Sequence, residues 1–138
     1  MKKLVALILA LALCLCASAS LADRMMVHVY ALCYDTNHVG SVWAGNYYIG
    51  GVQVYDGDVI DLDMDSYEFY TQIYDGDTVP DMGEVVSTNK VSASRLSKGF
   101  TVKQYLTVTE DKGSYKDYWC EWYIYYELTP VADAYVIH

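Results

Sequence analysis

Three segments of this chain alternate apolar and polar residues with a period of two, and no other feature constrains the fold as strongly. They are Met25 to Tyr34, Phe100 to Thr109 and Tyr118 to Leu128. Successive side chains of a β-strand point to opposite faces, so each segment predicts a strand with one face in a core. The 138-residue chain is therefore expected to be all-β.

Further strands are expected where runs of β-forming residues lie between Gly-rich or polar stretches. They are Tyr47 to Tyr55, Asp58 to Met64, Tyr67 to Tyr74, Glu84 to Ala93 and Ala132 to Ile137. Asp-Gly pairs such as Asp56-Gly57 are typical of hairpin turns, and Val91 to Lys98 could form one or two helical turns. This succession of short strands predicts an antiparallel two-sheet β-sandwich of immunoglobulin-like or C2-like shape. An inward Cys pair with Trp122 nearby fits this shape, and the topology stays open.

The first 22 residues have the composition of a signal peptide. Two lysines precede a thirteen-residue apolar run from Leu4 to Cys16, and small residues follow up to Ala22. The apolar run is too short to cross a bilayer as a lone helix. We expect cleavage after Ala22, or alternatively after Ala19, which leaves residues 23–138 as a single secreted domain.

Cysteine counting predicts one disulfide. Cys14 and Cys16 leave with the signal peptide, unless one of them carries a lipid, which the Leu before each of them disfavours. Cys33 and Cys120 then remain as an even pair in an oxidising compartment, and both have the inward parity of their strands. Two buried thiols or a metal site are the alternatives, and the absence of partner histidines weighs against a metal.

The first half of the chain holds the negative charge. Positions 25 to 89 contain eleven carboxylates and no Lys or Arg. Without residues 1–22 the chain has eighteen acids and seven bases, a net charge of −11. Partners rich in phosphate require Lys and Arg, so this acidity argues against nucleic acid or an anionic membrane as a partner of the mature chain.

Two Tyr-Asp-Gly-Asp turns, one at residues 55–58 and one at 74–77, point to a candidate calcium site. If both turns lie at the same end of a sandwich, their carboxylates would converge with two later acids, and calcium prefers such oxygen-rich loops. The candidate ligands are Asp56, Asp58, Asp75, Asp77, Asp81 and Glu84. A favoured turn used twice is one alternative. Another is pairing of the loop acids with Lys90, Arg95, Lys98 and Lys103.

A third group of acids alternates with apolar residues: Asp61, Asp63 and Asp65 against Ile60, Leu62 and Met64. We interpret these acids as the solvated face of a strand, whose charge discourages edge-to-edge pairing. An EF-hand is excluded because Ser66 and Gln72 stand where that loop requires Gly and Glu.

The chain contains no recognisable catalytic motif. His28, His38 and His138 lack metal-binding spacing, and no nucleophile, phosphate-loop or zinc-protease signature occurs. We therefore predict that the protein is not an enzyme. A small secreted hydrolase using paired carboxylates is one alternative, because Asp side chains are abundant, and a secreted inhibitor or structural protein is another.

Aromatic residues exceed what a core of this size can hold. The chain has fifteen Tyr and three Trp, and the outward parity of Trp119, Tyr123 and Tyr125 predicts a binding face on one sheet. Tyr and Trp combine a flat apolar body with a polar tip, which suits protein surfaces or sugar rings. The alternative is that sheets favour Tyr for cross-strand packing alone.

Three short motifs carry a resemblance to a group of proteins: Asn37-His38-Val39-Gly40-Ser41-Val42-Trp43, Val54-Tyr55-Asp56-Gly57-Asp58 and Val79-Pro80-Asp81-Met82-Gly83. In them the chain resembles small exported proteins of Gram-positive gut-type bacteria that have no assigned role. The resemblance implies fold and export only. Residues and resemblance together predict a secreted, non-enzymatic binding or surface-associated module. Its partner would be a protein or carbohydrate at the cell surface, and calcium is the only candidate cofactor.

Overall fold

The structure is a computed structural model that describes residues 23–37, 43–75, 82–86, 89–110 and 118–131. The expected signal peptide and the expected strand from Ala132 to Ile137 lie outside these residues. The described part is nearly all strand, with one short helix, as the alternation predicted. Its paired strands run antiparallel to each other.

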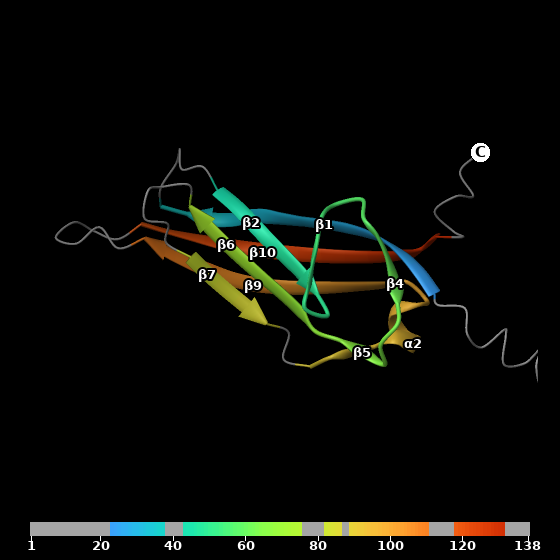
Figure 1. The fold of residues 1–138 in the computed structure, drawn as a ribbon. Helices are drawn as coiled ribbons and strands as arrows, with labels where there is room; N and C mark the ends of the chain where they lie inside the picture. Colours follow the sequence, from blue (N-terminus) through green and yellow to red (C-terminus); the bar gives the residue numbers. More distant parts are fainter. Residues whose placement is uncertain (1–22, 38–42, 76–81, 87–88, 111–117, 132–138) are drawn as a thin grey trace, which may run out of the picture.

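The strands in the described residues form two four-stranded sheets and one small ladder (Figure 1). Sheet A has the order β4-β1-β10-β9, sheet B has the order β3-β2-β6-β7, and β5 pairs with β8. The elements are β1 (Asp23–Thr36), β2 (Trp43–Ile49), β3 (Val52–Val54), β4 (Val59–Leu62), β5 (Ser66–Tyr67), β6 (Phe69–Asp75), β7 (Met82–Val86), β8 (Val91–Ser92), α2 (Ala93–Leu96), β9 (Phe100–Glu110) and β10 (Tyr118–Pro130).

Strand β10 lies inside sheet A, between β1 and β9. The alternation predicted for it is confirmed where its side chains are described, because every second residue is buried: Cys120, Trp122, Ile124, Tyr126 and Leu128. Strand β1 pairs with it from Met25, opposite Pro130, to Thr36, opposite Cys120. The pairing is irregular between Cys33 and Asp35, where one extra residue lies on β1.

The segment from Tyr47 to Tyr55 is a hairpin and not the single strand that the sequence predicted. Strand β2 ends at Ile49, directly opposite Val52 at the start of β3. Gly50 and Gly51 between them have φ angles of +59° and +81°. A two-residue hairpin turn favours positive φ at both positions, which side chains with a Cβ resist. The Gly-Gly pair is therefore the turn signal in this part of the chain.

The Asp56-Gly57 pair makes a turn between the two sheets, although an Asp-Gly pair predicts a hairpin. The strand before it belongs to sheet B and the strand after it to sheet A. The amide of Asp58 donates to the carbonyl of Tyr55 (3.0 Å), and the amide of Gly57 donates to the carbonyl of Val27 (2.8 Å). The turn is thus attached to β1, and it joins two edge strands.

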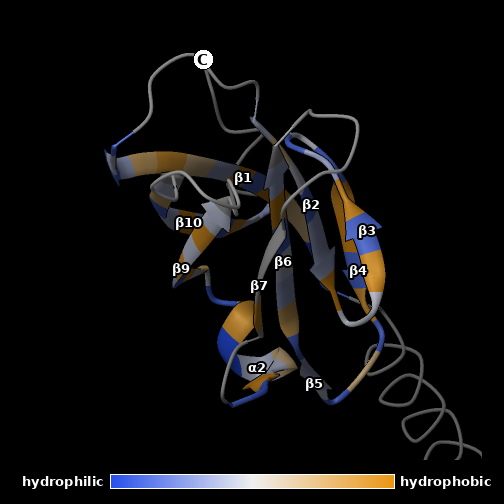
Figure 2. Cartoon of the chain, turned by 90° about the vertical axis from the view of Figure 1, so that its left-hand side faces the viewer, coloured by the Kyte–Doolittle hydropathy of each residue, from blue (hydrophilic) through white to orange (hydrophobic). Residues whose placement is uncertain are grey.

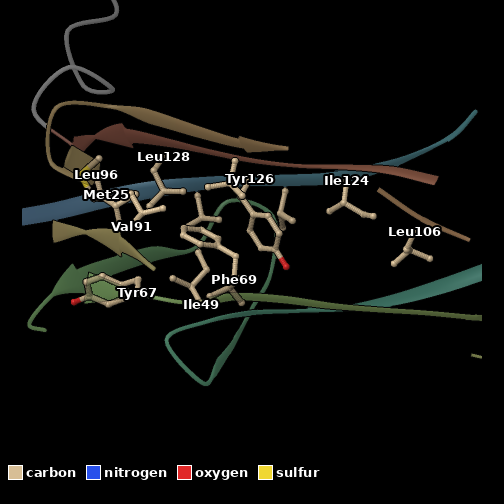
Figure 3. Close-up of a cluster of buried hydrophobic side chains, with 14 of the residues drawn as sticks. Met25, Ile49, Tyr67, Phe69, Val91, Leu96, Leu106, Ile124, Tyr126 and Leu128 are labelled. Carbon is tan, nitrogen blue, oxygen red and sulfur yellow. The ribbon is translucent and has the colours of Figure 1, made fainter. Parts of the chain in front are cut away.

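Both sheets contribute to one cluster of buried apolar side chains. The ring of Tyr126 in β10 lies 5.1 Å from that of Phe69 and 6.1 Å from that of Tyr47, both edge-to-face. Figure 3 shows Tyr126 and Phe69 pointing toward each other between two layers of strands. Farther along, the rings of Trp43 in β2 and Trp122 in β10 are 5.6 Å apart. Along β9 and β10 of sheet A, more and less hydrophobic residues alternate (Figure 2), and every second residue is buried where the side chains are described.

Two local predictions next to this core have different outcomes. The helical turn expected between Val91 and Lys98 is confirmed as α2, which places Leu96 in the core with no exposed surface. Met64 was expected to point inward with Leu62. It is 44% exposed because β4 ends at Leu62 and the alternation does not continue beyond it.

Three polar side chains link the sheets inside the core. Thr71 Oγ1 of β6 donates to Gln104 Oε1 of β9 (2.6 Å), and Gln104 Nε2 donates to the carbonyl of Phe69 (2.9 Å). The Tyr126 hydroxyl lies 2.7 Å from Thr71 Oγ1 and donates to the carbonyl of Tyr70 (2.8 Å). Burial raises the pKa of Tyr126 to about 12. The buried network is therefore neutral at physiological pH.

Replacing Gln104 with Leu should destabilise the fold, because the Thr71 hydroxyl and the Phe69 carbonyl would each lose a buried partner. An unsatisfied buried group costs roughly 1–3 kcal/mol, so we expect the free energy of unfolding in urea to fall by about 2 kcal/mol. Gln53→Leu is the matched control, since Gln53 is exposed on β3 and its replacement should cost less than about 0.5 kcal/mol. Equal losses in the two variants would contradict the importance of the buried network.

Candidate functional site

The outer face of sheet A carries tyrosines on its three longest strands. We name this surface the aromatic face and define it by Tyr30 and Tyr34 of β1, Tyr105 of β9, and Tyr123 and Tyr125 of β10. Tyr30 is directly opposite Tyr125, and Tyr105 is directly opposite Tyr123. Such cross-strand neighbours have Cβ atoms about 4.5–5.5 Å apart, so the strand register itself brings the rings together.

Ring contacts connect these tyrosines. The rings of Tyr30 and Tyr125 stack with centroids 5.1 Å apart and an interplanar angle of 17°. The ring of Tyr123 meets Tyr34 edge-on at 5.1 Å and Tyr105 at 5.4 Å. Aromatic pairs of this kind contribute about 0.5–1.5 kcal/mol beyond the area that they bury. Each ring of the aromatic face is therefore oriented by at least one other ring.

Lys103 of β9 joins the two groups of rings. Its Nζ lies 4.1 Å from the centroid of Tyr123 and 5.6 Å from that of Tyr125. A cation over an aromatic ring gains about 0.5–1 kcal/mol at an exposed site. Arg95 lies similarly, 4.8 Å from the centroid of Phe100. Both basic residues were alternatives for neutralising the loop acids, and the structure places both over aromatic rings.

The aromatic face is most exposed at its borders. Tyr34 is 64% exposed and Tyr105 is 46% exposed, and Leu32, directly opposite Tyr123, is 53% exposed. The two central rings, Tyr123 and Tyr125, are half-buried by their neighbours. Apolar bodies with hydroxyl tips are typical of the residues enriched in protein interfaces.

The structure gathers two of the three aromatic residues that the sequence singled out. Tyr123 and Tyr125 form the centre of the face. Trp119 is half-buried near the start of β10, where its amide donates to Asn37 Oδ1 (2.8 Å) and its carbonyl accepts from Thr36 Oγ1 (2.8 Å). The sequence prediction did not include Tyr30, Tyr34 and Tyr105. These three tyrosines occupy outward positions in the alternating segments Met25 to Tyr34 and Phe100 to Thr109, and that position could have identified them as surface residues.

A polar border adjoins the face along β1. The Tyr30 hydroxyl donates to Glu127 Oε1 (3.0 Å), and this hydrogen bond raises the pKa of Tyr30. The His28 ring lies 4.7 Å from the Tyr30 ring, and its Nδ1 is hydrogen-bonded to Asp56 Oδ1. Asp56 Oδ1 also accepts from the amide of Val29 (3.0 Å). The hydrogen bond from His28, followed by the one from Val29, holds the pKa of Asp56 below its usual value.

The predicted calcium ligands fall into two groups. Asp56 is hydrogen-bonded to His28, and Asp58 Oδ2 accepts from the amide of Tyr55 (2.8 Å). Both carboxylates of the first turn therefore have hydrogen-bond partners within the protein. Asp77 and Asp81 lie outside the described residues, as do the side chains of Asp75 and Glu84. The described residues contain no group of three or more side chains suited to hold a metal ion. Calcium binding at the second turn stays a prediction.

Asp61, Asp63 and Asp65 are exposed, in agreement with the prediction of a solvated acidic face. Asp61 pairs with Arg24 across the β1–β4 ladder, with Nε and Oδ1 3.3 Å apart. Asp63 Oδ1 accepts from the Tyr67 hydroxyl (3.2 Å). Both side chains of the ion pair are more than half exposed, so the pair contributes little to stability.

Cys33 of β1 and Cys120 of β10 are in contact, with their sulfur atoms 2.9 Å apart. The structure records them as two thiols, one exposed at Cys33 and one buried at Cys120. The two residues have the same parity, as predicted, but Cys33 is exposed because it lies where the pairing of β1 becomes irregular. Burial raises the pKa of Cys120 to about 12.

Comparison with protein families, with curated proteins and with solved structures found no match to this chain. Within the described residues, no helix has the length and apolar character needed to cross a membrane.

The contact with His28 predicts how Asp56 titrates. The folded pKa of Asp56 lies below the value of 3.8 for the free group, so ionised Asp56 stabilises the fold above that pH. This contribution is lost as the pH falls through the folded pKa. A carbon-13 NMR titration of the Asp56 carboxyl should have its midpoint below 3.8, and His28→Phe, which keeps an aromatic ring and removes the donor, should raise it.

The matched control for this titration is Glu121→Gln. It removes a carboxylate from the same sheet face, opposite Asp35 and Thr107 and away from the contact between His28 and Asp56. The Asp56 midpoint should be the same in this variant as in the parent protein. A parent midpoint at or above 3.8 would show that the hydrogen bond does not act on Asp56 in solution.

Proposed function

We propose that this protein is a secreted, non-enzymatic binding module and that its aromatic face contacts the partner. The observation that supports this function is the packing of five tyrosines across three strands, in which each ring is held by another. Binding through such a surface costs little side-chain entropy, because the rings are ordered before the partner arrives. Tyr also offers a large contact area with few rotatable bonds.

A protein partner fits the aromatic face better than a carbohydrate does. A sugar ring stacks on the open flat side of an aromatic ring. Here Tyr30 and Tyr125 stack on each other, and Lys103 covers one side of Tyr123. The most exposed rings, Tyr34 and Tyr105, combine apolar bodies with hydroxyl tips, which match the mixture of apolar and polar groups on a protein surface.

The architecture proposed for this module is a two-sheet β-sandwich. Two four-stranded antiparallel sheets that share one buried cluster support it. The alternation of apolar and polar residues along each long strand agrees with a sheet that has one face in a core. Export is supported by the composition of residues 1–22, and residues 23–138 are proposed to be one domain.

We also propose that Cys33 and Cys120 form a disulfide in the exported protein. Their sulfur contact supports this pairing. The bond would close a loop of 86 residues, which is worth about 4–5 kcal/mol in the chain-entropy model.

The intact mass of the exported protein should therefore be lower by two hydrogen atoms than that of the reduced chain, and a reductant should lower the unfolding midpoint. The double variant Cys33→Ser, Cys120→Ala is the control, because its midpoint should not respond to the reductant. A parent protein that is equally insensitive would contradict the disulfide.

We propose that calcium has a structural role and stabilises the acidic loops. The density of carboxylates in residues 74–84 supports it. A ligand that binds the native state raises the unfolding midpoint, so millimolar calcium should raise the midpoint of the parent protein. Asp77→Asn combined with Asp81→Asn should remove the increase. An unchanged midpoint in the parent protein would contradict the site.

Truncating the exposed tyrosines of the aromatic face should weaken binding without unfolding the protein. We expect Tyr34→Ser and Tyr105→Ser each to lower the affinity for cell-envelope preparations about tenfold, the effect of a moderate interface hot spot. Tyr48→Ser is the matched control. Tyr48 forms a similar cross-strand pair with Tyr70 in sheet B, with centroids 5.5 Å apart.

Retention of the labelled protein on the envelope preparation measures this binding. Loss of retention after protease treatment of the envelope would support a protein partner. Loss after periodate oxidation alone would show that the partner is a carbohydrate. If the Tyr34, Tyr105 and Tyr48 variants are all retained as well as the parent, the aromatic face is not the binding surface.

A further inference from the structure

A cavity of 390 Å³ opens where the edge strands of the two sheets separate. Its volume lies in the range of about 300–1,000 Å³ that is typical of small-molecule sites. Val52 of β3, Ile60 of β4 and Met64 provide its accessible apolar surface, and the buried side chains of Ile49 and Val54 lie beneath. Two carboxylates, Asp61 and Asp63, also line it. The cavity therefore combines apolar walls with negative charge, and it uses none of the tyrosines of the aromatic face.

The backbone of Gly50 keeps the walls of this cavity close together. A Cβ at this position would lie 2.6 Å from Cε of Met64 and 2.9 Å from Cδ1 of Tyr67. Both side chains thus pack directly against the hairpin turn. The Tyr67 hydroxyl accepts from the amide of Met64 (2.7 Å) and donates to Asp63 Oδ1 (3.2 Å). The Asp63 carboxylate is therefore held in place before any ligand binds.

The two carboxylates of the cavity differ in whether a basic side chain neutralises their charge. Asp61 forms an ion pair with Arg24. Asp63 accepts a hydrogen bond from a neutral hydroxyl, and in the described part of the chain no Lys or Arg forms an ion pair with it. Glu68 and Lys90 line a smaller neighbouring hollow of 230 Å³, and neither of them lines the cavity. The uncompensated charge of the cavity is therefore the carboxylate of Asp63.

We propose that this cavity binds an aliphatic ammonium compound. The alkyl chain lies against Val52, Ile60 and Met64, and the ammonium group donates hydrogen bonds to Asp63. A fatty acid of the same length would bring a second carboxylate against Asp63, which disfavours it electrostatically. This site extends beyond the proposed function, because it lies at the edges of the sheets and takes a small molecule.

A series of n-alkylammonium ions from butyl to octyl tests the site by isothermal titration calorimetry on the purified protein. Burial of apolar surface should tighten binding about fourfold for each added methylene, which corresponds to ~0.8 kcal/mol. Octanoate should bind at least ten times more weakly than octylammonium. Equal affinities for octanoate and octylammonium, or affinity that does not change with chain length, would overturn the proposal.

Two variants locate the binding on the cavity. Asp63→Asn keeps an acceptor for the Tyr67 hydroxyl and removes the charge, so it should weaken octylammonium binding about tenfold and abolish the preference over octanoate. Asp35→Asn is its control, because Asp35 is an exposed acid at the far end of β1. Val52→Trp should block the cavity from its rim, since Val52 lines it and is 67% exposed. Tyr55→Trp, at an exposed residue outside the cavity, is the second control.

Unchanged binding in both Asp63→Asn and Val52→Trp would place the ligand elsewhere and overturn the proposal. Circular dichroism and the unfolding midpoint of each variant separate loss of the site from loss of the fold. The Tyr34→Ser variant should bind octylammonium as tightly as the parent protein does. Failure of the ammonium site and failure of the aromatic face are therefore distinguished by independent measurements.

Discussion

The buried hydrogen bonds from Thr71 to Gln104, from Gln104 to the Phe69 carbonyl and from Tyr126 to the Tyr70 carbonyl hold the two sheets in a single relative position. The hydrophobic effect is not directional, so burial of apolar area alone does not fix where one sheet lies on the other. A buried hydroxyl or amide would lose its partner after such a shift, at a cost of a kilocalorie per mole or more. Tyr126 lies on an inner strand of sheet A and Thr71 on an inner strand of sheet B, so the sheets are joined near their centres. The edge cavity depends on this arrangement, because residues of both sheets line it.

The strands themselves were largely predictable, while the connections between them were not. Alternation identified β1, β9 and β10, because burial of one sheet face acts on every second residue. The Gly50-Gly51 hairpin was missed inside a segment that reads as one strand. The turn at Asp56-Gly57 was located, but its role was not, since a turn motif specifies local φ and ψ angles and not the sheet that the next strand joins. That choice depends on distant backbone contacts such as the one from Gly57 to Val27.

The candidate sites show the same division. Parity within one strand was enough to place Tyr123 and Tyr125 on an outer face. Their neighbours Tyr30 and Tyr105 follow from the register of β1 and β9 against β10, which no local pattern contains. The cavity is less predictable still, because it depends on two edge strands from different sheets and on a glycine that admits two side chains.

The contact between Trp43 and Trp122 has a practical consequence. One indole belongs to β2 and the other to β10, and their rings meet edge-on across the boundary between the sheets. The indole nitrogen of Trp122 is buried and makes no hydrogen bond in the described residues, so this chromophore is shielded from water. Any event that separates the sheets would hydrate it and uncouple the two rings at the same moment. The protein thus carries an intrinsic optical probe of sheet separation, and no external label is needed to observe it.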